Sequence, residues 1–281
     1  MRQPRYAIMP LQGIDMAAKY RYEELTWPEV REAVAAERVV VLPVGTVEQH
    51  GPHLPLVTDV LTATELSRLA VARIPDEALL MPPVYYSFNE HHLDFPGTIA
   101  VAGDTIIHYV TDIGTSLAHH GFRKILIVNG HGSNVPFLDI AARNITNRSP
   151  AICAMVPWWS LVPRELLAEL RESEFPGGMA HACELETSVL LYLRGDLVQM
   201  DKAEKDISFP KTEFFYWDLQ SASPVFFQEW FSRYSRTGTV GDPLKATAEK
   251  GRRFAEAVAG RMVDLIREFR ARKIQPRVDH H

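Results

Sequence analysis

The order of secondary structure predicted from the sequence is that of an α/β protein with a mostly parallel central sheet. Four short runs rich in β-branched and apolar residues predict buried strands, at 38–44, 79–84, 124–128 and 151–156. Segments with apolar residues at helical spacing separate these runs. Strands that alternate with helices form a parallel sheet with helices on both faces, so we expect a three-layer α/β/α fold.

The first predicted helix covers residues 27–36. Thr26 suits its N-cap position, and Pro28 and Glu29 suit its first turn. Residues 1–20, which precede it, are expected to form an extended N-terminal arm.

Five further helices are predicted along the chain, at about 59–73, 104–120, 135–147, 183–193 and 243–270. Thr58 is the expected N-cap of the first of these, and Gly121 ends the second in the C′ position. Residues 199–240, rich in aromatic residues, Pro and Ser, are expected to form loops, and 272–281 a flexible tail. Because no repeat and no linker-like stretch divides the chain, residues 1–281 are expected to form one domain.

Composition excludes several classes of partner. The chain has 281 residues, 46% of them hydrophobic, and its net charge of -5 gives no reason to expect nucleic acid or an anionic membrane. No apolar run approaches the ~20 residues of a membrane span, and the N-terminus lacks the apolar stretch of a secretory signal. The two cysteines, Cys153 and Cys183, suit a reducing compartment. We therefore expect a cytoplasmic protein that acts on a small molecule.

Acidic and histidine side chains follow the predicted strands. Glu48 and His50 come just after the first strand, Asp59 begins the next helix, and His131 follows the third strand between two glycines. In sheets of this type, ligands bind outside the carboxyl ends of the strands, so these side chains are expected to lie close together. A further group, made of His181, Glu184 and Glu186, begins a later helix.

Imidazoles and carboxylates from separate loops suit one or two divalent ions such as Zn²⁺ or Mn²⁺. A carboxylate such as Asp59 would then bridge two ions, as in other two-metal hydrolases. Each residue taken singly also has a structural explanation. Glu48 fits a solvated loop, Asp59 fits the first turn of a helix, and His131 fits a tight turn.

Several sequence blocks, taken in order, resemble the creatininase (creatinine amidohydrolase) family. The longest is LPVGTVEQHGPHLPLVTD at 42–59, and the others are FPGT at 95–98, NGHGSN at 129–134, HACELETS at 181–188 and GDPLKATAEKG at 241–251. The resemblance implies a three-layer α/β/α fold, commonly assembled as a hexamer. It also implies a binuclear Zn or Mn site, for which Fe²⁺ is a further candidate.

The resemblance implies a ligand set as well. Glu48 and His131 would bind one ion, His50 the other, and Asp59 both. Creatininase has a further glutamate ligand where this chain has Ser133, and relatives without that glutamate take one from the HAGE-type block, where Glu184 stands. Glu184 is thus the expected fifth ligand, with a share in proton transfer. His181 matches the histidine that helps protonate the leaving nitrogen.

Departures from creatininase concern the substrate. Gly132, Gly177 and Gly178 stand where creatininase has aromatic or acidic residues, which disfavours creatinine as the substrate. The expected substrate contacts are His92, Ser133 and Trp159. A solvated loop explains His92 equally well, and core or interface packing explains Trp159 equally well. The aromatic stretch 214–217, with 226–227 and 230–231, is expected at a subunit contact.

The predicted function is hydrolysis of the C–N bond of a small cyclic or linear amide, with a metal-bridging hydroxide as nucleophile and a homo-oligomer as the assembly. Creatinine hydrolysis, removal of a formyl group and trimming of a peptide are alternatives within the family. A two-metal phosphoester hydrolase is disfavoured because the blocks that carry the candidate site residues, at 42–59, 95–98, 129–134 and 181–188, supply no Arg or Lys to hold phosphate. A non-catalytic metal-binding scaffold is the alternative from another class.

Overall fold

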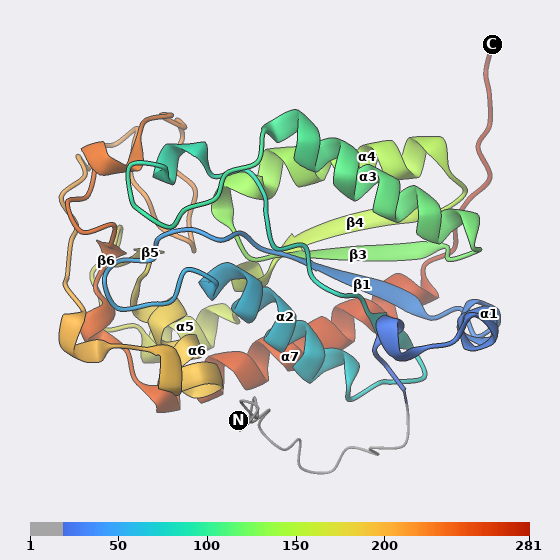
Figure 1. Cartoon of the computed structure of the whole chain (residues 1–281), viewed down its shortest axis with the longest axis horizontal. Coiled ribbons are helices and arrows are strands. Elements are labelled where there is room, and N and C mark those ends of the chain that lie inside the picture. Colours follow the sequence, from blue (N-terminus) through green and yellow to red (C-terminus); the bar gives the residue numbers. More distant parts are fainter. Residues whose placement is uncertain (1–18) are drawn as a thin grey trace, which may run out of the picture.

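The computed structural model describes residues 19–281 and has a four-stranded, wholly parallel sheet in the order β2-β1-β3-β4. The strands are β1 (Val39–Val44), β2 (Ala78–Leu80), β3 (Lys124–Asn129) and β4 (Ile152–Pro157). The helices are α1 (Trp27–Ala35), α2 (Thr58–Val71), α3 (Gly103–His119), α4 (Val135–Arg148), α5 (Arg164–Leu170), α6 (Glu184–Arg194) and α7 (Ala248–Ala271). Helices α3 and α4 cover one face of the sheet, and α2 and α7 cover the other (Figure 1). The predicted α/β fold with a parallel sheet is confirmed.

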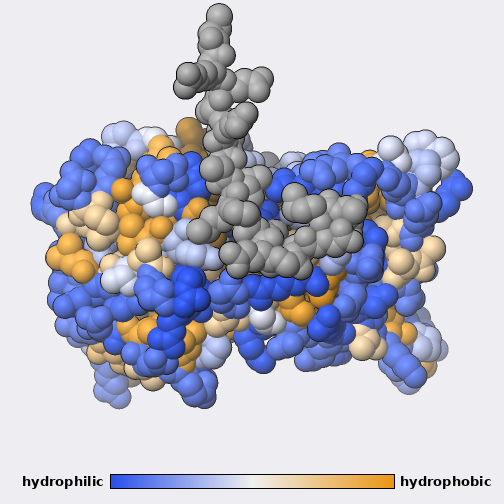
Figure 2. Space-filling view, turned by 90° about the horizontal axis from the view of Figure 1, so that it is seen from below, coloured by the Kyte–Doolittle hydropathy of each residue, from blue (hydrophilic) through white to orange (hydrophobic). Residues whose placement is uncertain are grey.

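The core lies on both faces of the sheet because successive strand residues point to opposite sides. Val39 and Val41 pack with residues of α2 and α7, whereas Val40 packs with Leu117 of α3 and Ile145 of α4. All six residues of β1 are therefore buried, as expected for a strand covered by helices on both faces. Figure 2 shows the side on which α2 and α7 lie. The coloured part of this surface is mainly hydrophilic, with scattered hydrophobic residues.

Two of the predicted helix-end signals are confirmed, and one is wrong. Thr26 is the N-cap of α1, and the Glu29 carboxylate accepts a hydrogen bond from its backbone N–H at 2.7 Å. Gly121 follows the C-cap of α3 with φ of 108°, so its predicted C′ role is confirmed. Thr58 is not an N-cap. It is the first residue of α2, and its hydroxyl donates to the Pro55 carbonyl oxygen instead of to the helix.

The predicted helix at 243–270 is split in two. A single 3₁₀ turn, Pro243–Lys245, precedes α7, which begins after Thr247, whose hydroxyl accepts from the Lys250 backbone N–H at 3.1 Å. This N-cap gives the long helix its own start, and the chain before Thr247 is extended.

The segment 199–240 contains no α-helix, as predicted. At its end begins β6 (Val240–Gly241), which pairs antiparallel with β5 (Met179–His181) earlier in the chain. This two-stranded ribbon was not predicted. The buried aromatic residues of the segment pack on one another, and they are Phe209, Phe215, Phe231 and Tyr234. The subunit contact expected at 214–217, 226–227 and 230–231 stays a prediction. Phe214 and Phe226 remain exposed. Helix α5 was also not predicted.

Residues 272–281 have no regular secondary structure and are exposed. The expected N-terminal arm falls almost entirely on residues 1–18, outside the described part of the chain. Within residues 19–281, none of the helices combines the length and the apolar character that crossing a membrane requires.

Candidate metal centre

Four of the predicted ligands meet at the carboxyl end of the sheet. Glu48 and His50 lie in the loop after β1, His131 directly follows β3, and Asp59 is in the first turn of α2. All four are buried, with at most 5% of their surface exposed. The topology therefore brings together side chains from three separate parts of the chain.

Asp59 lies between two imidazoles. Its Oδ1 is 3.0 Å from His50 Nε2, and its Oδ2 is 3.2 Å from His131 Nδ1. The same His131 nitrogen lies 3.2 Å from Glu48 Oε1. One carboxylate that faces two histidines with different oxygens has the arrangement expected of a bridging ligand.

Two glycines allow α2 to approach the strand ends this closely. A Cβ on Gly45 would lie 2.4 Å from the backbone nitrogen of Val60, and one on Gly130 would lie 2.3 Å from the carbonyl oxygen of Asp59. Neither position has room for a side chain, so backbone contact holds the first turn of α2 against β1 and β3.

Several polar atoms of this cluster form ion-pair contacts with one another but make no hydrogen bonds. Both Glu48 carboxylate oxygens, His50 Nε2, Asp59 Oδ2 and His131 Nε2 are buried without a hydrogen bond. Such atoms are rare in folded proteins, because leaving one unpaired costs about 1–3 kcal/mol. The ligand atoms of Glu48, His50 and Asp59 lie within 4.8 Å of one another. Buried nitrogen and oxygen atoms at this spacing fit divalent Zn or Mn, which accept mixed ligands.

The cluster also shifts the protonation of its members. Burial disfavours the charged imidazoles, but Asp59 outweighs it at His50 and raises the pKa there to about 9. At His131 the same burial is outweighed by Glu48 and Asp59, and the pKa is raised to about 10. Burial raises the pKa of Glu48. Without metal, these raised pKa values favour protonated imidazoles at His50 and His131, and a divalent ion that binds them would displace those protons.

Glu184, the expected fifth ligand, does not point into this cluster. Its Oε1 accepts from Lys250 Nζ at 2.6 Å, and its Oε2 accepts from the Ser173 backbone N–H at 2.8 Å. The backbone N–H of Glu172 also donates to it. The structure therefore gives Glu184 a complete set of partners on the side of α7.

Glu186 stands where Glu184 was expected. Its carboxylate groups with His50 and His181, with ligand atoms all within 4.8 Å of one another. Burial raises the pKa of this carboxyl group to about 7. Residues two apart on a helix point about 200° away from each other, so only one of the two glutamates can face the site. The sequence showed both glutamates, but not which side of α6 faces the strand ends.

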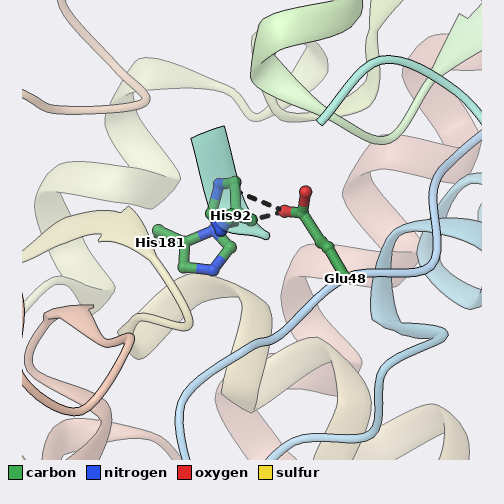
Figure 3. A group of neighbouring side chains, drawn as sticks. All are labelled: Glu48, His92 and His181. Atoms are coloured by element: carbon green, nitrogen blue, oxygen red, sulfur yellow. Dashed lines mark ion pairs between the residues drawn. The ribbon is translucent and has the colours of Figure 1, made fainter. Parts of the chain in front are cut away.

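Two further histidines reach the same Glu48 oxygen. His92 Nε2 and His181 Nδ1 each lie 3.8 Å from Glu48 Oε1 (Figure 3). His92 is buried in the short turn Glu90–His92, and His181 ends β5. Burial lowers the pKa of both imidazoles well below the ordinary value.

The two other predicted substrate contacts are Ser133 and Trp159. Ser133 Oγ is 3.0 Å from Nε2 of His91, whose ring stacks on that of His131 at 6.0 Å. Trp159 packs in the core cluster next to Trp158, with only 7% of its surface exposed.

Sequence reasoning overlooked two residues at the site. Phe231 covers the imidazoles, with ring centroids 4.2 Å from His92 and 4.8 Å from His181. Gln49 lies between the two candidate ligands Glu48 and His50 in the sequence and contacts both His92 and His181. The position of Gln49 between Glu48 and His50 in the sequence was the signal that could have pointed to it.

Known proteins resemble this chain in sequence. The family model described as "Creatininase: Creatinine amidohydrolase" matches residues 23–266. The creatinine amidohydrolase of Pseudomonas putida is 32% identical over 261 residues, which are 87% of this chain and 95% of the relative. A mycofactocin precursor peptide peptidase of Mycobacterium ulcerans is 32% identical over 246 residues, 83% of this chain and 82% of the relative.

Solved structures resemble the fold closely. The manganese form of creatininase is 30% identical, covers 90% of this chain and 100% of its own, and has a TM-score of 0.77. A zinc–zinc form of a creatininase variant is 30% identical, covers 90% and 99%, and has a TM-score of 0.76. The matched sequence, the fold and the buried cluster at the strand ends agree, and the chain belongs to the creatininase family.

Proposed function

We propose that this chain is a metal-dependent hydrolase that cleaves the C–N bond of a small amide. The observation that carries the proposal is the cluster of buried Glu48, His50, Asp59 and His131 at the sheet edge, which contains nitrogen and oxygen atoms without hydrogen bonds. The similarity to relatives named as an amidohydrolase and a peptidase supports the reaction class. The chain's substrate need not be that of either relative.

The ligands we propose are Glu48 and His131 for one ion, His50 and Glu186 for the other, and Asp59 for both. Glu186 replaces Glu184, whose carboxylate is already held by Lys250. Two divalent ions bound there would lower the pKa of water and polarise an amide carbonyl.

The chain's own residues supply the rest of the chemistry. His181, whose pKa burial lowers well below its ordinary value, is proposed to accept a proton and pass it to the departing nitrogen. His92 and Ser133 are proposed to contact the substrate, and Phe231 to keep water away from the imidazoles. Trp159 remains only a prediction, because its ring packs in the core.

Elemental analysis together with a substrate panel tests the proposal. The purified protein should hold two ions of Zn or Mn per chain and hydrolyse members of a panel of lactams, formamides and short peptides, but not phosphoesters. Asp59→Asn should remove both ions and the activity. Asp196→Asn is the matched control, because Asp196 is exposed and pairs only locally with Arg194.

Metal binding without hydrolysis of any panel member would favour the non-catalytic scaffold. An Asp59→Asn protein that keeps two ions would contradict the bridging role. Sedimentation of the intact protein tests the hexamer that family similarity suggests.

A further inference from the structure

Gln49 touches both histidines that flank the proposed metal ligands. The residue is buried, and its side-chain nitrogen Nε2 lies 2.8 Å from His92 Nδ1 and 3.1 Å from His181 Nε2. Its backbone carbonyl oxygen lies 2.9 Å from the same His181 nitrogen. A single residue thus contacts two imidazoles that come from residues 92 and 181, far apart in the chain.

The orientation of the Gln49 carboxamide is fixed by its other end. Oε1 accepts a hydrogen bond from the backbone N–H of Gly51 at 2.9 Å. If the amide were turned over, its NH₂ group would face that N–H, and two donors would meet. The NH₂ group therefore points toward the histidines.

This orientation decides where His92 carries its hydrogen. An amide NH₂ only donates, so His92 Nδ1 has to accept with its lone pair. A neutral imidazole then carries its hydrogen on Nε2. That is the nitrogen directed at Glu48 Oε1, 3.8 Å away. His92 thus presents an N–H donor to the site.

His181 is fixed by the backbone of the same residue. A carbonyl oxygen only accepts, so the 2.9 Å contact with Gln49 requires the hydrogen on His181 Nε2. With hydrogen on this nitrogen, the Gln49 amide nitrogen 3.1 Å away is a second donor and makes no hydrogen bond to it. The two shorter contacts, from His181 Nε2 to the carbonyl oxygen at 2.9 Å and from the Gln49 amide to His92 Nδ1 at 2.8 Å, are the ones satisfied. The nitrogen left with a lone pair is Nδ1, which faces the same Glu48 oxygen.

We infer that Gln49 is a positioning residue that makes the two histidines chemically unlike toward the site, with His92 as hydrogen-bond donor and His181 as proton acceptor. This inference rests on the proposed function for its catalytic meaning. It also has a structural consequence. Glu48, His92 and His181 form a group close enough to hold a metal ion, but His92 would meet an ion with its N–H, so this group is not a third metal site.

Solid-state ¹⁵N NMR of histidine-labelled protein tests the inference at any oligomeric size. The protein is measured metal-free and zinc-loaded, and signals are assigned with His92→Gln and His181→Gln. We expect both rings to carry hydrogen on Nε2. Zinc should bind at two ions per chain and leave the His92 Nδ1 signal in its hydrogen-bonded, unprotonated position.

Gln49→Glu provides the discriminating change, because a carboxylate accepts where the amide donates. His92 should move its hydrogen to Nδ1, while His181, held by the backbone oxygen, should keep it on Nε2. Gln228→Glu adds the same charge at an exposed position and should change neither ring.

Hydrogen on His92 Nδ1 in the unmodified protein would overturn the inference, and this measurement needs no variant to fold. An unchanged His92 in a folded Gln49→Glu protein would overturn it as well. A protein that binds no zinc and hydrolyses no amide would instead contradict the proposed function, and its metal-free spectrum would still report both rings.

Discussion

Glu184 and Glu186 offer a matched pair of substitutions that separates stability from metal binding. Glu184→Gln removes a charge from a buried pair in which Lys250 Nζ lies 2.6 Å from the carboxylate. Breaking one partner of a buried ion pair costs about 3–5 kcal/mol, because the other charge is left behind. Lys250 keeps a second, more exposed partner in Glu172 at 2.7 Å, so we expect the lower end, about 3 kcal/mol.

A loss of about 3 kcal/mol corresponds to a fall in Tm of roughly 6–12 °C in a domain of this size. Glu184→Gln should nevertheless keep both ions, since its carboxylate faces α7. Glu186→Gln should have the opposite effect. Its carboxyl group has a pKa raised to about 7 by burial, so an uncharged amide is tolerated and the metal-free Tm should change little.

Glu186→Gln should lower the affinity for one of the two zinc ions by at least about a hundredfold. Substituting a residue that only supports a metal ligand typically lowers affinity by about 10–100-fold, and loss of a ligand itself should cost more. The assays are thermal unfolding of chelator-treated protein and elemental analysis after dialysis against graded zinc. The reasoning is refuted if Glu184→Gln loses an ion while Glu186→Gln retains both with unchanged affinity.

Three further predictions concern the same edge of the sheet. His181→Asn should keep its metals but lower kcat by about 10²–10⁴-fold, the usual contribution of a positioned acid–base group, and wild-type turnover would remove His181 from the mechanism. The raised pKa values of His50 and His131, about 9 and about 10, mean that zinc binding at pH 7 should release protons and that zinc affinity should rise from pH 6 to pH 9. Calorimetry in buffers of different ionisation enthalpy measures this release, and binding heats independent of the buffer would contradict it. Gly130→Ala should weaken zinc binding and cost about 1–3 kcal/mol of stability, because its Cβ would lie 2.3 Å from the Asp59 carbonyl oxygen. Gly132→Ala is the control, because a Cβ on Gly132 would meet no atom within 4 Å apart from its chain neighbours. This variant should have the Tm and the zinc affinity of the parent protein.

Local patterns in the sequence predicted most of the fold. The β-branched runs predicted the strands of the parallel sheet, and Gly121 marked the end of α3. The ribbon of β5 and β6 escaped prediction because its strands have three and two residues, too short for an alternating pattern. Helix α5 has seven residues and is similarly short.

The site was predictable where the sheet determines it and not elsewhere. Glu48, His50 and His131 follow strands, so topology alone brings them together. The choice between Glu184 and Glu186 depends on the rotation of α6 about its axis, which is set by packing against α7. Phe231 reaches the histidines only through the path of a long loop segment, and no local pattern specifies such a path.

The close contact of Gly45 and Gly130 with the first turn of α2 has a consequence for how the protein could change its substrate. A larger side chain at either position would displace the backbone that carries Asp59, so this edge leaves no room for variation. Phe231, by contrast, comes from a segment without α-helices and forms the other side of the site. New substrate ranges, in evolution or in engineering, should therefore arise by exchanging that loop while the strand ends stay as they are.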